Sequence, residues 1–456
     1  MTMRKLGQDT LAFRRVWRAL DQLLLAVDAN TAYRLVYQVI YLRSCSSAGW
    51  SEVVRGAGHI GQTLDTVWLR TRVGQALAGR RATEAGRLSA QVHAALEWLI
   101  AEVDQLETVD GLFGACLDRY STRHSKGGGD YYTPDDVAQL FAGLAAPQAG
   151  ERVRDPACGS GRLLRAAAHW ARAHSGGDVQ LSGADIRHQA RYVAAVHLAL
   201  HGLRVELGED TVDTLRTGLS DTPADVVITN PPVNMSDWGH GELDDDPRWF
   251  LGRPPRANAN FAWAQHILAD LGPVGRAVVL LSSGAARNTN VADTRIRRAL
   301  VEEGLIVGIV ALPAGLFPHT RSGTALWLLR KGDRPHADEI LFADARQLGT
   351  RHQTAGRRFE GADVDRLIRI FAAWQGLRPM DTSDAPGTVS WCRAVSREDV
   401  IAADYDLTPA RHVQQQSSVP SVQDGHPLSP RDELHLRLEQ SVVARSRVIR
   451  ALGGRA

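Results

Sequence analysis

Residues 225–233 read Asp-Val-Val-Ile-Thr-Asn-Pro-Pro-Val, an apolar run followed by an amide and two prolines. The run predicts a buried strand that ends at Asn230. An aromatic amine is a poor nucleophile because its lone pair is delocalised into the ring, so a catalyst must place hydrogen-bond acceptors against both N–H bonds. The Asn230 Oδ1 and the Pro231 carbonyl suit this task, since the prolines stiffen the loop and have no N–H to compete. We therefore predict group transfer to an amino nitrogen, with Asn230, Pro231, Pro232 and Val233 as the candidate catalytic residues.

An isolated Asn-Pro-Pro is also common in turns that carry no chemistry. Its position here favours the catalytic interpretation, because it follows a predicted buried strand and comes after a glycine-bearing turn. That turn lies in residues 153–164, Val-Arg-Asp-Pro-Ala-Cys-Gly-Ser-Gly-Arg-Leu-Leu. Gly159 and Gly161 allow a ligand to approach the backbone closely, and the free N–H groups of the helix that begins near Arg162 face the same space.

Acidic residues follow the neighbouring predicted strands. Asp185 comes at the strand end where an open α/β sheet places the carboxylate that holds two ribose hydroxyls, although helix capping is the alternative. Asp210 follows the next strand and could accept a hydrogen bond from an adenine amino group, with capping or solvent exposure as the alternative. Asp155 suits an amino-acid ammonium group, and Thr133 with the tyrosine pair before it would line the opposite wall. The candidate cofactor-binding residues are Tyr131, Tyr132, Thr133, Pro134, Asp155, Ala157, Gly159, Ser160, Gly161, Asp185 and Asp210.

The segments that must position these residues alternate between strand and helix patterns. Such alternation predicts an α/β fold with a doubly wound, mostly parallel, Rossmann-like sheet and ligands at the carboxyl ends of the strands. We expect strands at 152–154, 180–185, 204–206, 226–229, 277–281 and 306–312, with later strands at 325–329 and 339–342. We expect helices at 135–144, 162–173, 188–201, 259–271 and 293–303.

The pattern changes at both ends of this region. Residues 1–124 predict a helical N-terminal domain, because apolar residues recur there at helical spacing. Residues 125–345 form the predicted catalytic domain, which begins with the glycine-rich run 125–129. Residues 346–456 predict a helical C-terminal region that ends in a partner-binding tail, with a last helix at about 430–452.

Composition excludes several other classes of protein. The chain has 456 residues, a formal net charge of +2 and 44% hydrophobic residues, which is ordinary for a soluble globular protein. The four cysteines have no metal-ligand spacing, so we expect no metal site and a reducing cytoplasmic location. No lysine is followed by Ser or Thr, which excludes a P-loop, and the apolar run near Leu23 is too short to span a membrane.

The ordered motifs resemble those of the modification subunit of type I restriction–modification systems, an N6-adenine DNA methyltransferase. The resemblance covers nearly the whole chain. It rests on Gly-Asp-Tyr-Tyr-Thr-Pro134, Asp-Pro-Ala-Cys-Gly-Ser-Gly161, Asn-Pro-Pro-Val-Asn-Met-Ser-Asp-Trp238, Asp-Pro-Arg-Trp249, Asn-Ala-Asn-Phe-Ala-Trp263, Ala-Leu-Pro-Ala-Gly-Leu-Phe317 and Asp-Tyr-Asp-Leu-Thr-Pro-Ala-Arg411.

The resemblance implies a DNA methyltransferase subunit that uses S-adenosyl-L-methionine as its cofactor and double-stranded DNA as its substrate. It implies that a separate DNA specificity subunit chooses the target, and it allows a second copy of the chain and a motor-nuclease restriction subunit as further partners. The methylated group would be the N6 amine of an adenine flipped out of the helix.

One residue departs from the family pattern. The family motif ends in Phe or Tyr, where this sequence has Val233. The missing ring would stack on the flipped adenine, and loss of such stacking costs on the order of 1–3 kcal/mol. Trp238, Phe261 and Tyr132 are candidate replacements. The departure motivates an alternative function, a catalytically weakened, cofactor-binding DNA-clamp subunit with an assembly or defence role. A methyltransferase for protein glutamine or a small molecule is a third hypothesis, which the long helical flanks disfavour.

Overall fold

The structure is a computed structural model that describes residues 4–56, 59–77, 89–124, 133–208, 210–317, 323–352 and 356–413. The chain clusters into two compact units, Met1–Gln414 and Gln415–Ala456, and all described residues belong to the first. Tyr131, Tyr132, the glycine-rich run 125–129 and the helix expected at 430–452 lie outside the described residues.

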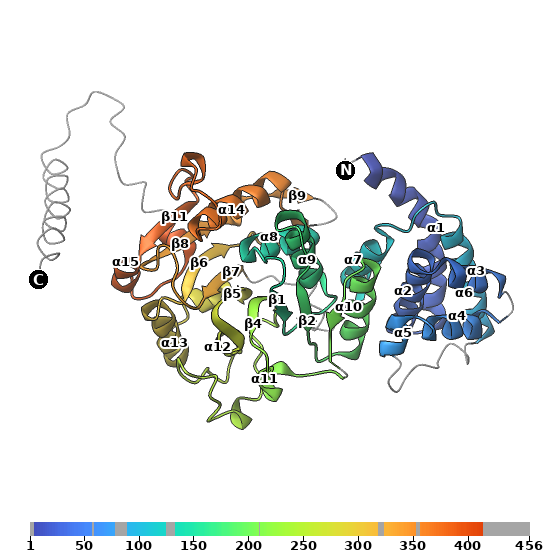
Figure 1. Cartoon of the computed structure of the whole chain (residues 1–456), viewed down its shortest axis with the longest axis horizontal. Helices are drawn as coiled ribbons and strands as arrows, with labels where there is room; N and C mark the ends of the chain where they lie inside the picture. Colours follow the sequence, from blue (N-terminus) through green and yellow to red (C-terminus); the bar gives the residue numbers. More distant parts are fainter. Residues whose placement is uncertain are drawn as a thin grey trace, which may run out of the picture. The chain divides into compact units, whose positions relative to one another are not determined.

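The N-terminal segment is helical, as the apolar spacing predicted. Asp28 ends the first helix pattern and caps the second helix, because its carboxylate accepts a hydrogen bond from the Thr31 N–H at 3.1 Å. Apolar side chains of these helices share one core, which includes Leu20, Val36 and Leu99. The helices, seen at the right of Figure 1, are α1 (Arg4–Ala26), α2 (Ala29–Cys45), α3 (Ser47–Arg55), α4 (Ile60–Leu69), α5 (Arg72–Leu77), α6 (Ala90–Asp104) and α7 (Leu112–His124).

A nine-stranded sheet forms the centre of the catalytic region, in the order β11-β8-β6-β7-β5-β4-β1-β2-β3. Its pairs are parallel except β5–β7, β6–β7 and β8–β11, so the sheet is mostly parallel, as predicted. The strands are β1 (Arg152–Asp155), β2 (Gln180–Gly183), β3 (Val205–Glu206), β4 (Ala224–Thr229), β5 (Leu271–Ser282), β6 (Ile306–Ala311), β7 (Thr324–Arg330), β8 (Glu339–Asp344) and β11 (Cys392–Ser396).

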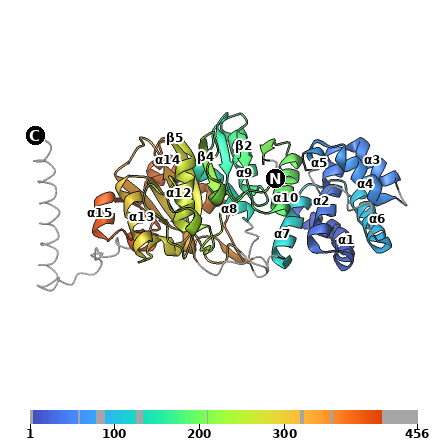
Figure 2. The same cartoon turned by 90° about the horizontal axis from the view of Figure 1, so that it is seen from below.

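Helices cover both faces of the sheet because the strand side chains alternate between two apolar cores. In β4, Val226 and Ile228 enter one core and Val227 enters the other. The first core lies under α8 (Asp135–Ala145), α9 (Arg162–His174) and α14 (Gly361–Trp374), and the second under α12 (Asn260–Asp270) and α13 (Val291–Glu302). Figure 1 shows the two sets on opposite sides, and Figure 2, seen from below, has α12 and α13 in front of the sheet.

The strand order reverses between β1 and β4. The chain moves outward from β1 to β2 and β3 on one side, and then returns to β4 and β5 on the other. Such a reversal opens a crevice beyond the carboxyl ends of the two strands, which is where open α/β sheets bind their ligands. Asp155 ends β1 and Asn230 follows β4, so the two residues predicted to do chemistry border this crevice.

Helix α10 (His188–Leu200) belongs to two cores at once. Ala194 and Leu198 pack in the core under α9, whereas Val193 and Val196 pack in the core of the N-terminal helices. The Phe113 ring of α7 stacks on the His197 ring of α10 with 5.0 Å between centroids. Helix α10 therefore joins the N-terminal helices to the helices that cover the central sheet.

The segment after Arg346 differs from the helical expectation. Strand β11 adds to the sheet antiparallel to β8, and Cys392 lies opposite Ala343 in that pairing. The strand was missed because its sequence, Cys-Arg-Ala-Val-Ser, is short and partly polar, which suits an edge strand. The remaining elements are β9 (Thr350–His352), β10 (Gly356–Arg358), α14, α15 (Arg397–Ala402) and α16 (Pro409–Val413). The division of the chain into domains at residues 124 and 345 stays a prediction.

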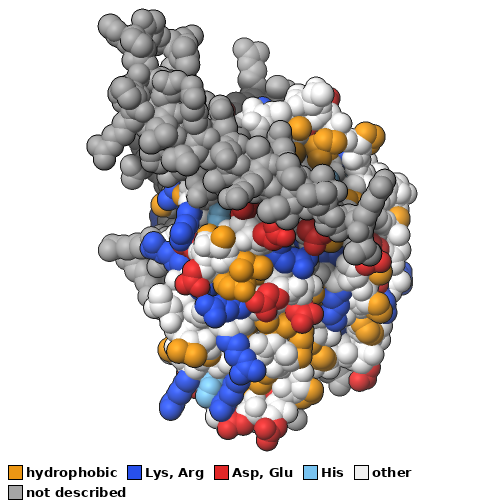
Figure 3. All heavy atoms as spheres, turned by 90° about the vertical axis from the view of Figure 1, so that its left-hand side faces the viewer, with side chains coloured by type: hydrophobic (Ala, Val, Ile, Leu, Met, Phe, Trp, Pro, Cys, Tyr) orange, Lys and Arg blue, Asp and Glu red, His pale blue; other side chains and the backbone are white. Residues whose placement is uncertain are grey.

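The surface over α13 and α15 has mixed charge. Figure 3 views the molecule from that side and shows basic and acidic side chains interspersed. Arg298 of α13 pairs with Asp404 at 3.0 Å, and Arg397 of α15 pairs with Asp338 at 3.3 Å. Among the helices that the structure describes, none is both long and apolar enough to cross a membrane.

Candidate active site at the carboxyl ends of β1, β2 and β4

The loop after β1 is a tight glycine turn that leads into α9. Gly159 and Gly161 have φ values of 52° and 74°, a conformation that side-chain-bearing residues rarely adopt. A Cβ on Gly161 would lie 3.2 Å from Leu198 Cδ1, so glycine also permits the close approach of α10. No side chain caps the N-terminus of α9, which leaves its first N–H groups available to a ligand.

The Asp155 carboxyl lies at the base of this turn and is 1% exposed. Its Oδ1 accepts a hydrogen bond from the Ala157 N–H at 3.1 Å. Burial, aided by the negative charge of the nearby Asp185 carboxylate, raises the pKa of Asp155 from 3.8 to about 7 in spite of the hydrogen bond from Ala157, which lowers it. A cationic group placed beside Asp155 would reverse both effects, which makes this buried carboxyl a suitable partner for an ammonium group.

Asp185 follows β2 and is oriented by two neighbours. The Gly159 N–H donates to its Oδ2 at 3.0 Å, which ties the carboxylate to the glycine turn. The Arg187 backbone N–H and side-chain Nε donate to Oδ1 at 3.0 and 3.1 Å. Ile186, between them, has 61% of its surface exposed, although it is a large apolar residue.

Asp210 does not join the other predicted residues. Its side chain is 76% exposed, and its Oδ1 lies 3.9 Å from His188 Nδ1. The Asp210 Oδ1 accepts a hydrogen bond from the N–H of the next residue, Thr211, at 2.8 Å, and its exposure agrees with the solvent-exposed alternative.

The Asn230 side chain is buried behind the crevice, with 5% exposure. Its Nδ2 donates to Thr133 Oγ1 at 3.0 Å, and this contact fixes the orientation of the amide. The Asn230 Oδ1 then has no hydrogen-bond partner within the described residues. A buried acceptor without a partner is costly, so this oxygen is suited to accept a hydrogen bond from a ligand.

Thr133 and Pro134 stand directly before α8, where Pro134 is the N-cap. Arg162, at the start of α9, is 3% exposed and pairs with Asp118 at 2.8 Å and Asp135 at 3.4 Å. This buried guanidinium therefore joins α7, α8 and α9 behind the glycine turn. Thr133 was predicted to line the cofactor pocket, and it also accepts a hydrogen bond from Asn230. The sequence did not indicate this contact, because the two residues lie far apart in the chain.

Val233, where the family has an aromatic residue, is half-buried at the end of the Asn-Pro-Pro loop. Two of the proposed replacements for the missing ring are wrong. Trp238 is 1% exposed and packs against Trp249, and Phe261 is fully buried against Trp327. Neither presents a face on which a base could stack. Tyr132 lies outside the described residues.

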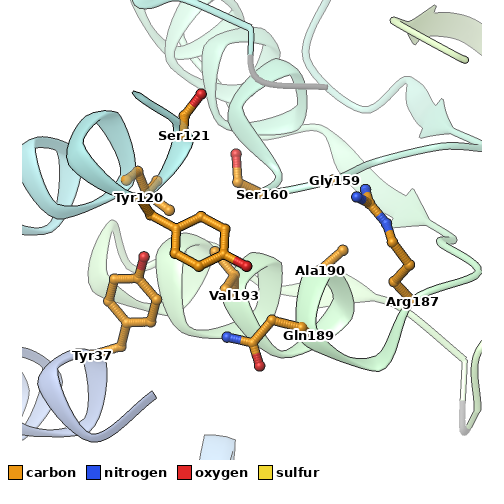
Figure 4. A pocket seen from close by; sticks show the side chains of 10 residues that line it. Tyr37, Tyr120, Ser121, Gly159, Ser160, Arg187, Gln189, Ala190 and Val193 are labelled. Atoms are coloured by element: carbon orange, nitrogen blue, oxygen red, sulfur yellow. The ribbon is translucent and has the colours of Figure 1, made fainter. Parts of the chain in front are cut away.

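A cavity adjoins the glycine turn on the side of the N-terminal helices. Figure 4 shows Tyr37 of α2 and Tyr120 of α7 facing Ser160 and the start of α10 across it. His197 supports this wall, because its Nδ1 lies 2.8 Å from the Ser160 carbonyl oxygen. Burial holds the pKa of His197 well below 6.5, so the ring is neutral and its Nδ1–H donates to that oxygen. The cavity is lined by Tyr37, Leu117, Tyr120, Ser121, Gly159, Ser160, Arg187, Gln189, Ala190 and Val193.

The one cysteine of the glycine turn, Cys158, is not an activated nucleophile. The Cys158 thiol is buried, and burial raises its pKa well above 9, so it stays protonated in the folded turn. In the described part of the chain no cluster of three His, Cys, Asp or Glu residues has metal-binding geometry. The crevice offers carboxylates, neutral hydrogen-bond acceptors and the uncapped N–H groups at the start of α9.

The Asp155 carboxyl makes stability depend on pH in a defined direction. The folded chain keeps a proton between pH 4 and 7 that the unfolded chain releases, so the free energy of unfolding falls as pH rises through this window. The free energy of unfolding of Asp155→Asn, relative to that of the native chain, should therefore increase from pH 4 to 7. The increase should reach on the order of 4 kcal/mol at most, with no further change above pH 8. Urea unfolding of both proteins across this range measures the difference, and parallel profiles would contradict the assignment.

The Thr133 hydroxyl can be tested by isosteric replacement. Thr133→Val leaves the buried Asn230 Nδ2 without an acceptor, so we expect the free energy of unfolding to fall by about 1–3 kcal/mol. Thr133→Ser keeps the hydroxyl and is expected to lose less, in spite of the missing methyl group. Chemical denaturation measures both variants, and equal losses would show that packing, and not the hydrogen bond, makes the contribution.

Residues 107–419, which are more than half of the chain, match the family described as N-6 DNA Methylase. The chain is 32% identical over 301 residues to the type I restriction enzyme HindI methylase subunit of Haemophilus influenzae. This alignment covers 65% of the chain and 66% of that protein. It is 28% identical over 309 residues to the type I restriction enzyme MjaIX methylase subunit of Methanocaldococcus jannaschii, which covers 65% of this chain and 54% of that protein. The alignments thus span about half to two thirds of the length of these curated relatives.

A solved structure shares the fold over most of the chain. It is the methyltransferase subunit of a type I restriction–modification system from Streptococcus thermophilus, with a TM-score of 0.70 at 20% identity, covering 88% of this chain and 98% of that one. The matched range of the family begins within the helices before α8 and includes the glycine turn, Asp185 and the Asn-Pro-Pro loop. The chain belongs to the N-6 DNA methylase family.

Proposed function

We propose that this chain is an adenine-N6 DNA methyltransferase subunit of a type I-like restriction–modification complex. It transfers a methyl group from S-adenosyl-L-methionine to an adenine flipped out of double-stranded DNA. The observation that carries the proposal is the Asn230 amide, whose Nδ2 is held by Thr133 while its buried Oδ1 has no partner among the described residues. Family membership supports the same reaction.

The residues of the crevice fit the cofactor. Asp155 would hold its ammonium group, since a cation removes the penalty that burial imposes on the carboxylate. The uncapped N-terminus of α9 and the glycine turn would receive its carboxylate end, and the exposed Ile186 offers an apolar surface for adenine. When bound, the cofactor supplies an electrophilic methyl group on its sulfonium.

Asp185 would bind the two ribose hydroxyls, but Arg187 now occupies part of its hydrogen-bonding capacity. The Arg187 Nε and Nη2 donate to the two carboxylate oxygens at 3.1 and 3.4 Å. The Arg187 side chain is 31% exposed. The proposal therefore includes a rotation of Arg187 away from Asp185 as the ribose binds. Asp210 could accept a hydrogen bond from the adenine amino group only if its exposed side chain turned inward.

The reaction requires positioning more than acid–base catalysis. Asn230 Oδ1 and the Pro231 carbonyl oxygen each accept a hydrogen bond from one of the two N6–H groups of the adenine, and this returns electron density to the nitrogen. The amide is neutral and accepts hydrogen bonds without taking a proton. As the new carbon–nitrogen bond forms, the bond between the methyl carbon and the sulfonium sulfur would break, S-adenosyl-L-homocysteine would leave, and the methylated amine would release its surplus proton to water. Pro231 and Pro232 have fixed φ angles and no N–H, so the loop can hold both acceptors in one geometry.

The partners follow from this role. We propose that a DNA specificity subunit selects the target and that the chain works with double-stranded DNA inside a complex. A second copy of the chain and a motor-nuclease restriction subunit are further proposed partners. The type I methylase subunits among its relatives support this assembly.

Val233 supports a second candidate, the catalytically weakened DNA-clamp subunit. Its side chain has no ring, and the buried Trp238 and Phe261 offer no substitute surface. Under this reading the chain binds the cofactor and DNA, and contributes mainly to assembly or defence.

The main test is methyl transfer from labelled S-adenosyl-L-methionine to unmethylated, PCR-amplified DNA by the full chain purified with its specificity subunit. We expect label on adenine N6 and a loss on the order of 10²- to 10³-fold in Asn230→Ala, because an acceptor used in the transition state is removed. Cofactor binding, measured by calorimetry, should be retained in the variant. No label despite cofactor binding by the native chain would reject the enzyme and favour the clamp.

Replacement of Val233 separates the two candidates. If the missing ring limits the reaction, Val233→Phe should raise kcat/KM for DNA by roughly ten- to a hundredfold, which corresponds to the value of one base-stacking contact. Val233→Leu is the matched control, since it adds apolar bulk without a ring. An equal gain in both variants, or no gain in either, would show that stacking at this position does not limit the reaction.

A further inference from the structure

The loop that carries Asn230 is fixed at its far end by a pair of asparagines. Asn234 lies four residues downstream, with a φ of 56°. Its backbone N–H donates to Asn260 Oδ1 at 3.2 Å, and Asn260 Nδ2 donates to Asn234 Oδ1 at 3.0 Å. The backbone donor defines which atom of the Asn260 amide is the oxygen, and this in turn makes its nitrogen the donor to Asn234.

Asn260 is itself firmly held. It is the first residue of α12 and is 5% exposed. The Asn260 N–H donates to Asn258 Oδ1 at 3.2 Å, and the Asn258 amide donates to Asp293 of α13 at 3.2 Å. Asp293 is 1% exposed and also accepts from Asn288 at 2.7 Å. The loop is thereby connected to the start of two helices on the second face of the sheet.

We propose that the Asn234–Asn260 amide pair, which we call the amide clamp, positions the Asn-Pro-Pro loop for methyl transfer. β4 fixes the loop upstream, where it is paired with β5 as far as Thr229. The clamp fixes the loop downstream, and the two prolines between leave it few conformations. Asn234 and Asn260 are thus positioning residues that act through Asn230 and the Pro231 carbonyl. This inference rests on the proposed function.

The chemistry of the pair allows a sharp test. In Asn234→Asp, the Asn260 Nδ2 still donates to a carboxylate. In Asn260→Asp, the Asn234 N–H still has its acceptor, and the Asn234 amide can rotate by half a turn to donate its own Nδ2. In the double variant two carboxylates face each other without a donor between the side chains, and like charges at this separation repel. Each single variant should therefore keep the clamp, whereas the double variant should lose it.

The experiment measures kcat and the KM for S-adenosyl-L-methionine with the full chain and its specificity subunit on PCR-amplified DNA. We expect each single variant to keep kcat within about threefold, and the double variant to lose roughly ten- to a hundredfold in kcat, with the cofactor KM changed by less than about twofold. Thermal unfolding of all four proteins identifies any general loss of folding. Losses that simply multiply, or a large loss in either single variant, would overturn the clamp, because they indicate separate structural roles.

Hydrogen–deuterium exchange of residues 230–238 gives a readout that does not depend on activity. The double variant should exchange at least about tenfold faster in this segment, and the single variants should match the native chain. Unchanged exchange in the double variant would reject the clamp. If the native chain itself transfers no methyl group, the proposed function fails, and the exchange result alone then decides for or against the clamp.

Discussion

The hydrogen bond from Asn230 Nδ2 to Thr133 Oγ1 is the contact on which this site depends. An amide that must present its oxygen to a substrate needs a partner for its nitrogen, or it can rotate and present the wrong atom. Thr133 supplies that partner from the segment before α8, while β4 supplies the asparagine. The reversal of strand order beside β4 makes the contact possible, since it brings the carboxyl ends of β1 and β4 to one crevice beneath α8 and α9.

Electrostatics divides this crevice into two parts. Asp155 and Asp185 lie close enough to raise the pKa of the more deeply buried Asp155, and both face the glycine turn. The Asn-Pro-Pro loop, in contrast, offers neutral acceptors. A cationic cofactor group and an uncharged base amine would thus find separate environments a short distance apart, which is what a transfer between them requires.

Much of this arrangement was predictable because its determinants are local. The periodicity of apolar residues predicted α9, α10 and most of the central strands to within about two residues, although β5 begins at Leu271 and was expected from residue 277. The position after a strand predicted that Asp155, Asp185 and Asn230 would lie at one edge of the sheet. The contacts that orient these groups were not predictable, because they join distant segments. His197 looks like one more residue on the buried face of α10, and nothing in its neighbourhood indicates the Ser160 carbonyl. The Asn234–Asn260 pair was missed for the same reason, since it is defined by its partner, whereas strand β11 was missed because its short sequence is partly polar.

The shared helix α10 limits how the chain can be divided. Val193 and Val196 close the core of the N-terminal helices, and Ala194 and Leu198 close the core beneath the glycine turn. A boundary near residue 124 would separate helices α1 to α7 from the rest of the chain. Helix α10 would then expose Val193, Val196 and the side of His197 that stacks on Phe113. The N-terminal helices are therefore not an exchangeable cassette. When segments are exchanged between homologous chains, helices α1 to α7 and helix α10 must therefore come from the same chain.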